Sequence, residues 1–80
     1  SIQALTKYVG GHSDVLLGSA TTASEEDYLK VRSCASILGQ FASADDCWLA
    51  LRGLRTMMLR LKHQEAAGLE MARWLEAQPQ

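Results

Sequence analysis

The sequence predicts a mostly helical chain that opens with two or three short strands, and three observations support this fold class. Residues 1–24 are rich in glycine, serine and threonine and carry only short apolar runs. Residues 24–27 and 43–46 are serine-led acidic segments, which are typical helix starts. Apolar residues at spacings of three and four follow the first of them. With 80 residues, 48% of them hydrophobic, the chain has the size of one small domain.

The short strands are expected in the first part of the chain. Residues 2–5 form one candidate strand. The run Val-Leu-Leu at residues 15–17 is too short for a helix and is predicted to be a buried strand that ends at Gly18. Residues 10–11 are two glycines and mark a turn between these strands. The small and polar residues 20–23 suit a strand end or a loop.

The first two helices have clear start and stop signals. Ser24 is the predicted N-cap of a helix over about residues 25–38, and Gly39 supplies its C-terminal stop. Three acidic residues after Ser24 complement the helix dipole. Ser43 repeats the start signal, and the short helix that follows is expected to end at Gly53.

A third, longer helix is expected from a cap at Thr56 to about Ala77. About twenty helical residues span roughly 30 Å, which a chain of this size covers poorly. Much of its apolar face is therefore expected to pack on protein beyond this chain. The predicted inner face is the set Met58, Leu61, Leu69, Ala72 and Leu75, and the residues expected in a core or an interface are Met57, Met58, Trp48 and Trp74.

Charge and hydropathy argue against two classes of partner. Eight basic against nine acidic residues give a net charge of −1, whereas a nucleic-acid binder needs a clear basic excess. No apolar run approaches the roughly 18 residues that span a bilayer, and the first residues lack the pattern of a signal peptide. Cys34 and Cys47 fit no zinc or redox spacing and are expected to be buried, reduced thiols, which favours the cytoplasm.

Metal and nucleophilic-serine chemistry are also not expected. His12 and His63 have no cysteine or carboxylate at metal-ligand spacing, and His63 is expected on a solvated helix face. No serine lies in a G-x-S-x-G context. A local basic cluster is expected to pair with carboxylates rather than with nucleic acid; its members are Arg52, Arg55, Arg60 and Lys62.

Lys7 is the residue most suggestive of chemistry. It stands between Thr6 and Tyr8 in an uncharged segment, and no carboxylate lies within six residues of it. Desolvation by such flanks would lower the pKa of a lysine and make it a nucleophile or a base. The alternative from composition alone is a surface lysine whose ammonium group reaches solvent.

Two sequence blocks resemble the Cys/Met-metabolism family of pyridoxal-phosphate (PLP) enzymes, and the resemblance covers nearly the whole chain. The first block is the cofactor-lysine signature, Thr6-Lys7-Tyr8 followed by Gly11-His12-Ser13-Asp14, preceded by Ser1-Ile2-Gln3-Ala4 as in the bacterial cystathionine β-lyase branch. The second is Leu51-Arg52-Gly53-Leu54-Arg55-Thr56 with Arg60-Leu61, which resembles the segment before the long helix of the family.

The resemblance implies a role for each residue of the first block. Lys7 would bond covalently to the aldehyde carbon of the cofactor, pyridoxal 5′-phosphate, and would be the catalytic residue. Thr6 would bind the cofactor phosphate. Many family members carry a second phosphate-binding serine three residues before the lysine, where this chain has Ala4. The remaining matched residues would shape the loop; they are Tyr8, Gly11, His12 and Asp14.

The resemblance also implies an architecture and a reaction. The chain would be an internal piece of the α/β large domain of an aspartate-aminotransferase-like (fold type I) PLP enzyme, with a largely parallel sheet covered by helices. Residues 1–24 would carry the cofactor lysine, and residues 25–80 three helices leading toward a C-terminal domain. The groups that hold the pyridine ring and the substrate carboxylate would lie outside this chain.

The implied reaction is β-elimination of a small sulfur amino acid, cystathionine, in a cytoplasmic homo-oligomer resembling a tetramer of tight dimers. Another member of the family remains an alternative, namely a γ-lyase, γ-synthase or sulfhydrylase. A non-enzymatic helical interaction module remains a second alternative.

Overall fold

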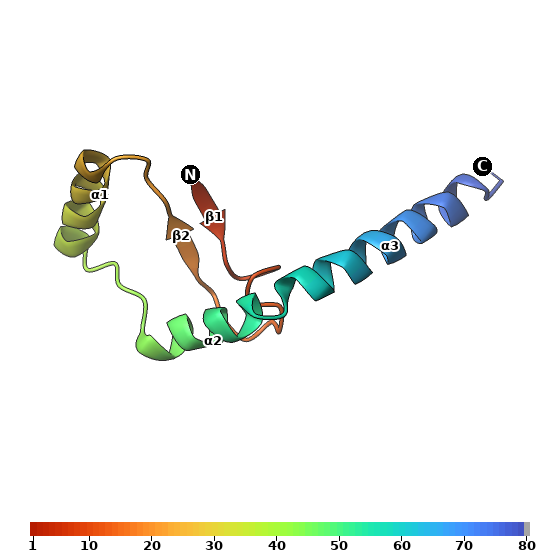
Figure 1. The fold of residues 1–80 in the computed structure, drawn as a ribbon, viewed down its shortest axis with the longest axis horizontal. Helices are drawn as coiled ribbons and strands as arrows, with labels where there is room; N and C mark the ends of the chain where they lie inside the picture. The colour runs from red at the N-terminus through yellow and green to blue at the C-terminus, as the bar shows by residue number, and fades with distance from the viewer. Residues whose placement is uncertain (80) are drawn as a thin grey trace.

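Two short strands and three helices follow one another along the chain, and the computed structural model describes residues 1–79 (Figure 1). Strands β1 (Ile2–Ala4) and β2 (Gly18–Ala20) pair antiparallel. The helices are α1 (Glu25–Leu38), α2 (Ala44–Leu54) and α3 (Met57–Glu76). The prediction of short strands before three helices is confirmed for these residues; Gln80, the last residue of the predicted helical part, lies outside them.

The strand predicted at residues 2–5 is confirmed over Ile2–Ala4, but the one predicted at residues 15–17 is wrong. Regular pairing begins only at Gly18, because the Leu17 amide donates to a side chain, the Thr6 hydroxyl, at 3.0 Å. Val15 is buried as expected, whereas Leu16 is 87% exposed. Of the apolar run, Val15 is the buried residue and holds a loop in place, and the run does not form a buried strand.

Both predicted serine caps are present. The Ser24 hydroxyl accepts a hydrogen bond from the Asp27 amide at 3.2 Å, and the Ser43 hydroxyl accepts one from the Asp46 amide at 3.0 Å. Gly39 ends α1 in the left-handed region with φ 67°. These local signals decide the ends of α1 without tertiary contacts, since α1 has no buried residue.

Replacing Ser24 by Ala in the complete protein is expected to lower the free energy of unfolding by about 1 kcal/mol, because the Asp27 amide loses its partner. Denaturant unfolding measures the change. Ser33→Ala is the matched control, since Ser33 is exposed inside α1 and alanine is the better helix former there. Equal stability of Ser24→Ala and the unsubstituted protein would contradict the cap.

The predicted boundary between the second and third helices needs correction. Gly53 does not end α2 but lies inside it and is buried. Thr56 stands at the N-cap of α3 as predicted, yet its side chain makes no capping bond to the helix. Its hydroxyl instead donates to the Gly53 carbonyl at 3.3 Å, so it joins the end of α2 to the start of α3.

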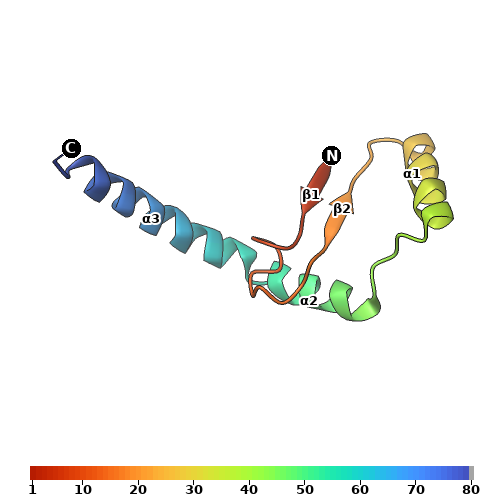
Figure 2. The ribbon, with the colours of Figure 1, turned by 180° about the vertical axis from the view of Figure 1, so that it is seen from behind.

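The chain is extended rather than compact. Its radius of gyration is 17.6 Å, against about 12 Å for a compact domain of 80 residues. Its accessible surface is 6889 Å², against about 4,800 Å² for a folded monomer of this mass. Figures 1 and 2 show α3 running away from the strands on one side and α1 lying apart on the other. The buried hydrophobic residues among those described are Val9, Val15 and Ala50.

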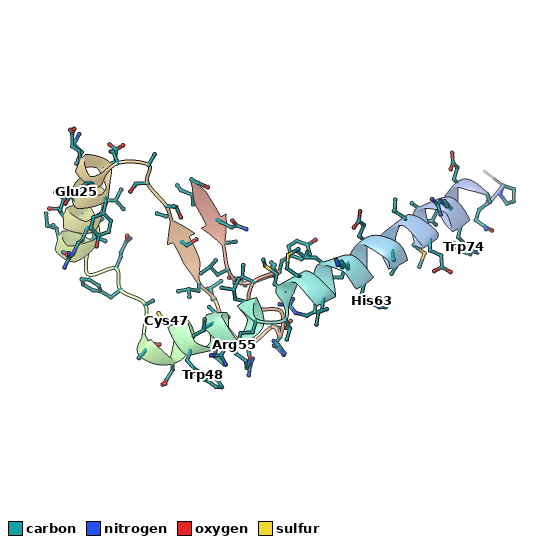
Figure 3. All side chains as sticks on the ribbon, in the orientation of Figure 1. Glu25, Cys47, Trp48, Arg55, His63 and Trp74 are labelled. Carbon is teal, nitrogen blue, oxygen red and sulfur yellow. The ribbon has the colours of Figure 1, made fainter. Side chains whose placement is uncertain are left out.

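Several side chains predicted to be buried are therefore exposed within the described chain. Both cysteines are free and exposed, which corrects the expectation of buried thiols. Trp48, Met58 and Trp74 are each more than half exposed, so they are not core residues of this chain. Figure 3 shows Trp48 projecting from α2 away from the strands and Trp74 near the far end of α3. On the predicted inner face of α3, Leu61 is half-buried and the other four residues are exposed.

Within residues 1–79, none of the helices combines the length and the hydropathy needed to cross a bilayer.

Candidate active site

Lys7 lies in a closed turn directly after β1. The Gly10 amide donates to the Leu5 carbonyl at 2.8 Å, and the Gly11 amide donates to the Lys7 carbonyl at 2.7 Å. Lys7 is thus outside any regular helix, as a lysine presented by a loop should be. Its side chain is exposed, so the desolvation expected from its sequence neighbours is not supplied by the residues described.

The residue before Lys7 is fixed by two hydrogen bonds to one partner. The Thr6 hydroxyl accepts from the Leu17 amide at 3.0 Å and donates to the Leu17 carbonyl at 3.2 Å. The Leu17 carbonyl also accepts from the Leu5 amide at 2.8 Å. Thr6 therefore ties the start of the Lys7 turn to the strand that follows it.

A concave pocket of about 600 Å³ lies beside this turn. Lys7 and Thr6 both line it, so the structure places the two predicted site residues at one cavity. The opposite wall comes from α3, through Arg60 and Gln64. The other lining residues belong to the loop after Lys7; they are Tyr8, Gly11, Ser13, Asp14, Val15 and Leu16.

The Lys7 turn rests on the junction of α2 and α3, which Figure 1 shows beside the loop after β1. Val9 and Gly10 are buried there against Gly53. A Cβ atom on Gly53 would overlap the carbonyl oxygens of both residues. Glycine at residue 53 is therefore needed for close approach of the turn, which explains why the predicted helix stop at this residue was wrong.

The loop after the turn is held by polar contacts from residues of the signature block. Asp14 forms an ion pair with Arg52 of α2. His12 Nδ1 lies 2.8 Å from the Gly10 carbonyl, and since a carbonyl only accepts, Nδ1 carries the proton. These contacts match the loop-shaping role expected of His12 and Asp14.

Two members of the basic cluster, Arg52 and Arg60, have different kinds of partner, and the side chains of Arg55 and Lys62 form no ion pair with the residues described. Arg52 pairs with a carboxylate as expected and also lies over the Trp48 ring, 5.6 Å from its centroid. Arg60 pairs with no carboxylate of residues 1–79; its guanidinium binds backbone carbonyls of the Lys7 turn. Sequence reasoning missed Arg60 and Gln64 as pocket residues, because 53 residues separate Lys7 from Arg60 and no local signal links them.

The remaining candidate groups stay apart from the pocket. His63 is exposed on α3, as expected for a solvated helix face. Among the residues described, no cluster of three or more His, Cys, Asp or Glu side chains is arranged to hold a metal ion.

Comparison with known proteins shows the family to which the chain belongs. The family model described as "Cys/Met metabolism PLP-dependent enzyme" matches residues 1–80. The chain belongs to this PLP-dependent enzyme family. The resemblance seen in the sequence is thereby confirmed, and PLP is the cofactor of the family, whose substrates are small-molecule amino acids.

Relatives within the family carry two kinds of name. The chain is 44% identical to a cystathionine beta-lyase of Bordetella avium and 39% identical to one of Haemophilus influenzae, in each case over 100% of this chain and 20% of the relative. It is 37% identical to a "Probable cystathionine gamma-synthase" of Herpetosiphon aurantiacus, over 98% of this chain and 24% of the relative. The chain thus spans about a fifth to a quarter of the length of these relatives. No solved structure gave a significant match.

Proposed function

We propose that the complete protein is a PLP-dependent carbon–sulfur lyase. It would convert cystathionine and water into homocysteine, pyruvate and ammonia. The observation that carries the proposal is the position of Lys7, which lies in a closed turn and lines the pocket in a chain of this family. β-Lyase names among the relatives favour this reaction over the γ-chemistry of the same family. Membership in an enzyme family speaks against the alternative of a helical interaction module.

The residues of the pocket fit the cofactor. A primary amine is the group that bonds to the aldehyde of PLP, and Lys7 is the only lysine that lines the pocket. The proton of the Thr6 hydroxyl now points to the Leu17 carbonyl, which keeps the Leu5 amide as a second partner. Thr6 can therefore turn its proton toward a phosphate without leaving that carbonyl unpaired. Ala4 lacks a hydroxyl, so it offers no second side-chain contact to the phosphate.

We assign two roles to Lys7 in the reaction. When bound, PLP supplies an electron sink for the pair left at the substrate Cα after proton removal. The Lys7 amine would hold the cofactor covalently through its aldehyde carbon until the substrate binds. Lys7 Nζ, then free, would take the proton from the substrate Cα. Departure of the thiol from Cβ would complete the elimination, and water would then convert the three-carbon product to pyruvate and ammonia.

The rest of the chain positions this amine. Thr6 holds the turn before Lys7, and the Gly11 amide holds the Lys7 carbonyl. We propose that the partners of the pyridine ring and of the substrate carboxylate come from other parts of a fold type I subunit, in a cytoplasmic homo-oligomer. The apolar faces of α1 and α3 that this chain leaves exposed would pack on those parts.

The products of cystathionine cleavage test the assigned reaction. The complete protein is expected to release pyruvate and homocysteine, because β-elimination breaks the bond between sulfur and the three-carbon unit. Release of 2-oxobutanoate and cysteine would instead show γ-elimination and overturn the β-lyase assignment within the family. Chromatography of the two 2-oxo acids distinguishes the outcomes in a single reaction mixture.

A further inference from the structure

Arg60 connects the first turn of α3 to the backbone that follows Lys7. Its Nη1 donates to the Tyr8 carbonyl at 2.8 Å, and its Nη2 donates to the carbonyls of Val9 at 3.2 Å and Gly53 at 2.7 Å. Its Nε donates to the Thr56 hydroxyl at 3.1 Å. One guanidinium group thus joins the Lys7 turn, the end of α2 and the start of α3.

Two carbonyl groups of the turn depend on this guanidinium for their hydrogen bonds. The carbonyls of Tyr8 and Val9 accept no other hydrogen bond within the described part of the chain. Val9 is 8% exposed, so its carbonyl has little access to water as a replacement partner. A polar group left unpaired in such a place is costly, and the turn would shift to reach solvent.

Two glycines make room for this arrangement. A Cβ atom on Gly11 would overlap the Arg60 guanidinium, and one on Gly53 would overlap the backbone of the turn. The turn is therefore enclosed between α2 and the Arg60 side chain. The conformation of the turn therefore depends on Gly53 and Arg60, which lie more than 40 positions away in the sequence. A turn held only by local hydrogen bonds would not need these two residues.

From these contacts we propose that Arg60 is a positioning residue for Lys7, an inference that rests on the function proposed above. Thr6 fixes the backbone on the N-terminal side of Lys7, through Leu17. Arg60 fixes it on the C-terminal side, starting at the carbonyl of the next residue, Tyr8. With both sides held, Lys7 Nζ is kept within reach of one place in the pocket, as proton transfer at Cα requires.

Arg60→Lys and Arg60→Gln, made in the complete PLP-loaded protein, test this role. Lysine keeps the positive charge but has a single donor atom, so it cannot span three carbonyls. We expect kcat for cystathionine cleavage to fall about 100-fold in both variants, since a displacement near 1 Å costs that much. KM is expected to change little, because the proposed role of Arg60 is to hold Lys7 and not the substrate.

Hydrogen exchange provides a readout that does not depend on turnover. The amides of Gly10 and Gly11 close the Lys7 turn, so their exchange is expected to accelerate at least tenfold in the Arg60 variants. Arg55→Gln is the matched control, because Arg55 is exposed at the same junction and its side chain forms no hydrogen bond or ion pair with the residues described. It should leave kcat and both exchange rates unchanged.

A second variant disturbs the packing of the Lys7 turn from α2 instead of from Arg60. Gly53→Ala leaves all Arg60 donors in place but pushes a methyl group into the carbonyls of Val9 and Gly10. It is expected to lower kcat and to accelerate Gly10 and Gly11 exchange as the Arg60 variants do. This arm keeps the proposal testable if Arg60→Gln does not fold, which circular dichroism reveals.

The outcomes separate this inference from the proposed function. A raised KM with unchanged kcat in Arg60→Lys would show that Arg60 binds substrate, and the positioning role would be wrong. Wild-type kcat and exchange rates in Arg60→Lys would also overturn it, while an inactive Lys7→Ala variant in parallel would keep the proposed function intact. Full activity of Lys7→Ala would instead remove the proposed function itself.

Discussion

Replacing Lys7 by Ala in the complete protein is expected to abolish cystathionine cleavage. Loss of a general base alone costs about 10²–10⁴-fold in rate, and loss of the covalent link to PLP adds to that cost. Lys7→Arg should be as inactive as Lys7→Ala, because arginine keeps the charge but stays protonated and cannot serve as the base. Pyruvate release under saturating cystathionine measures both variants.

Lys62→Ala is the matched control for these variants. Lys62 is exposed on α3, two residues from Arg60, and its side chain forms no ion pair or hydrogen bond within residues 1–79. It should retain the turnover of the unsubstituted protein. If Lys7→Ala kept normal turnover and the visible absorbance of the bound cofactor, the role assigned to Lys7 would be wrong.

The 80-residue chain on its own is expected to be inactive. Few hydrophobic side chains are buried, and the accessible surface exceeds that of a compact monomer by about 2,100 Å². Such a chain lacks the apolar burial that offsets the entropy of ordering, so a broad and non-cooperative thermal transition is expected. Lys7 is exposed, so any bond it formed with PLP would be open to hydrolysis.

Calorimetry and pyruvate release measure these two properties of the isolated chain. The complete protein, assayed at equal PLP concentration, is the positive control. A sharp unfolding transition together with pyruvate release from the 80-residue chain would contradict the expectation that other parts of the subunit complete the site.

The helices were predictable because their signals are local. Ser24 and Ser43 accept hydrogen bonds from amides three residues away, and Gly39 adopts the left-handed conformation that its position after an apolar stripe suggests. These interactions need no partner elsewhere in the chain. The ends of α1 and the start of α2 could therefore be predicted to the residue.

The predictions that were wrong concern residues whose structure depends on contacts with distant parts of the sequence. A glycine at residue 53 suggested a helix end, but its presence is explained by the close contact of Gly53 with Val9 and Gly10. The strand expected at residues 15–17 starts later, because a threonine side chain takes the Leu17 amide. Burial of Cys34 and Cys47 was wrong because α1 has no buried residue and because Cys47 is exposed on α2, whose buried residues are Ala50 and Gly53.

Only the part of the candidate site that lies in one contiguous stretch of sequence was predictable. Lys7 and Thr6 were predicted from a contiguous motif, and both line one pocket. Arg60 was noted only in the basic cluster and in the second sequence block, with no link to Lys7, because its hydrogen bonds reach residues 51 and 52 positions earlier. Folding brings α3 to the Lys7 turn, and neither segment alone carries that information.

The most direct test of the central claim is to trap the bond between the protein and its cofactor. Borohydride reduction of the PLP-loaded complete protein makes that bond permanent, and mass spectrometry of the digested protein then locates the modified lysine. We expect modification at Lys7 and none at Lys30 or Lys62. Modification at another lysine, with Lys7 unmodified in a fully active preparation, would contradict it.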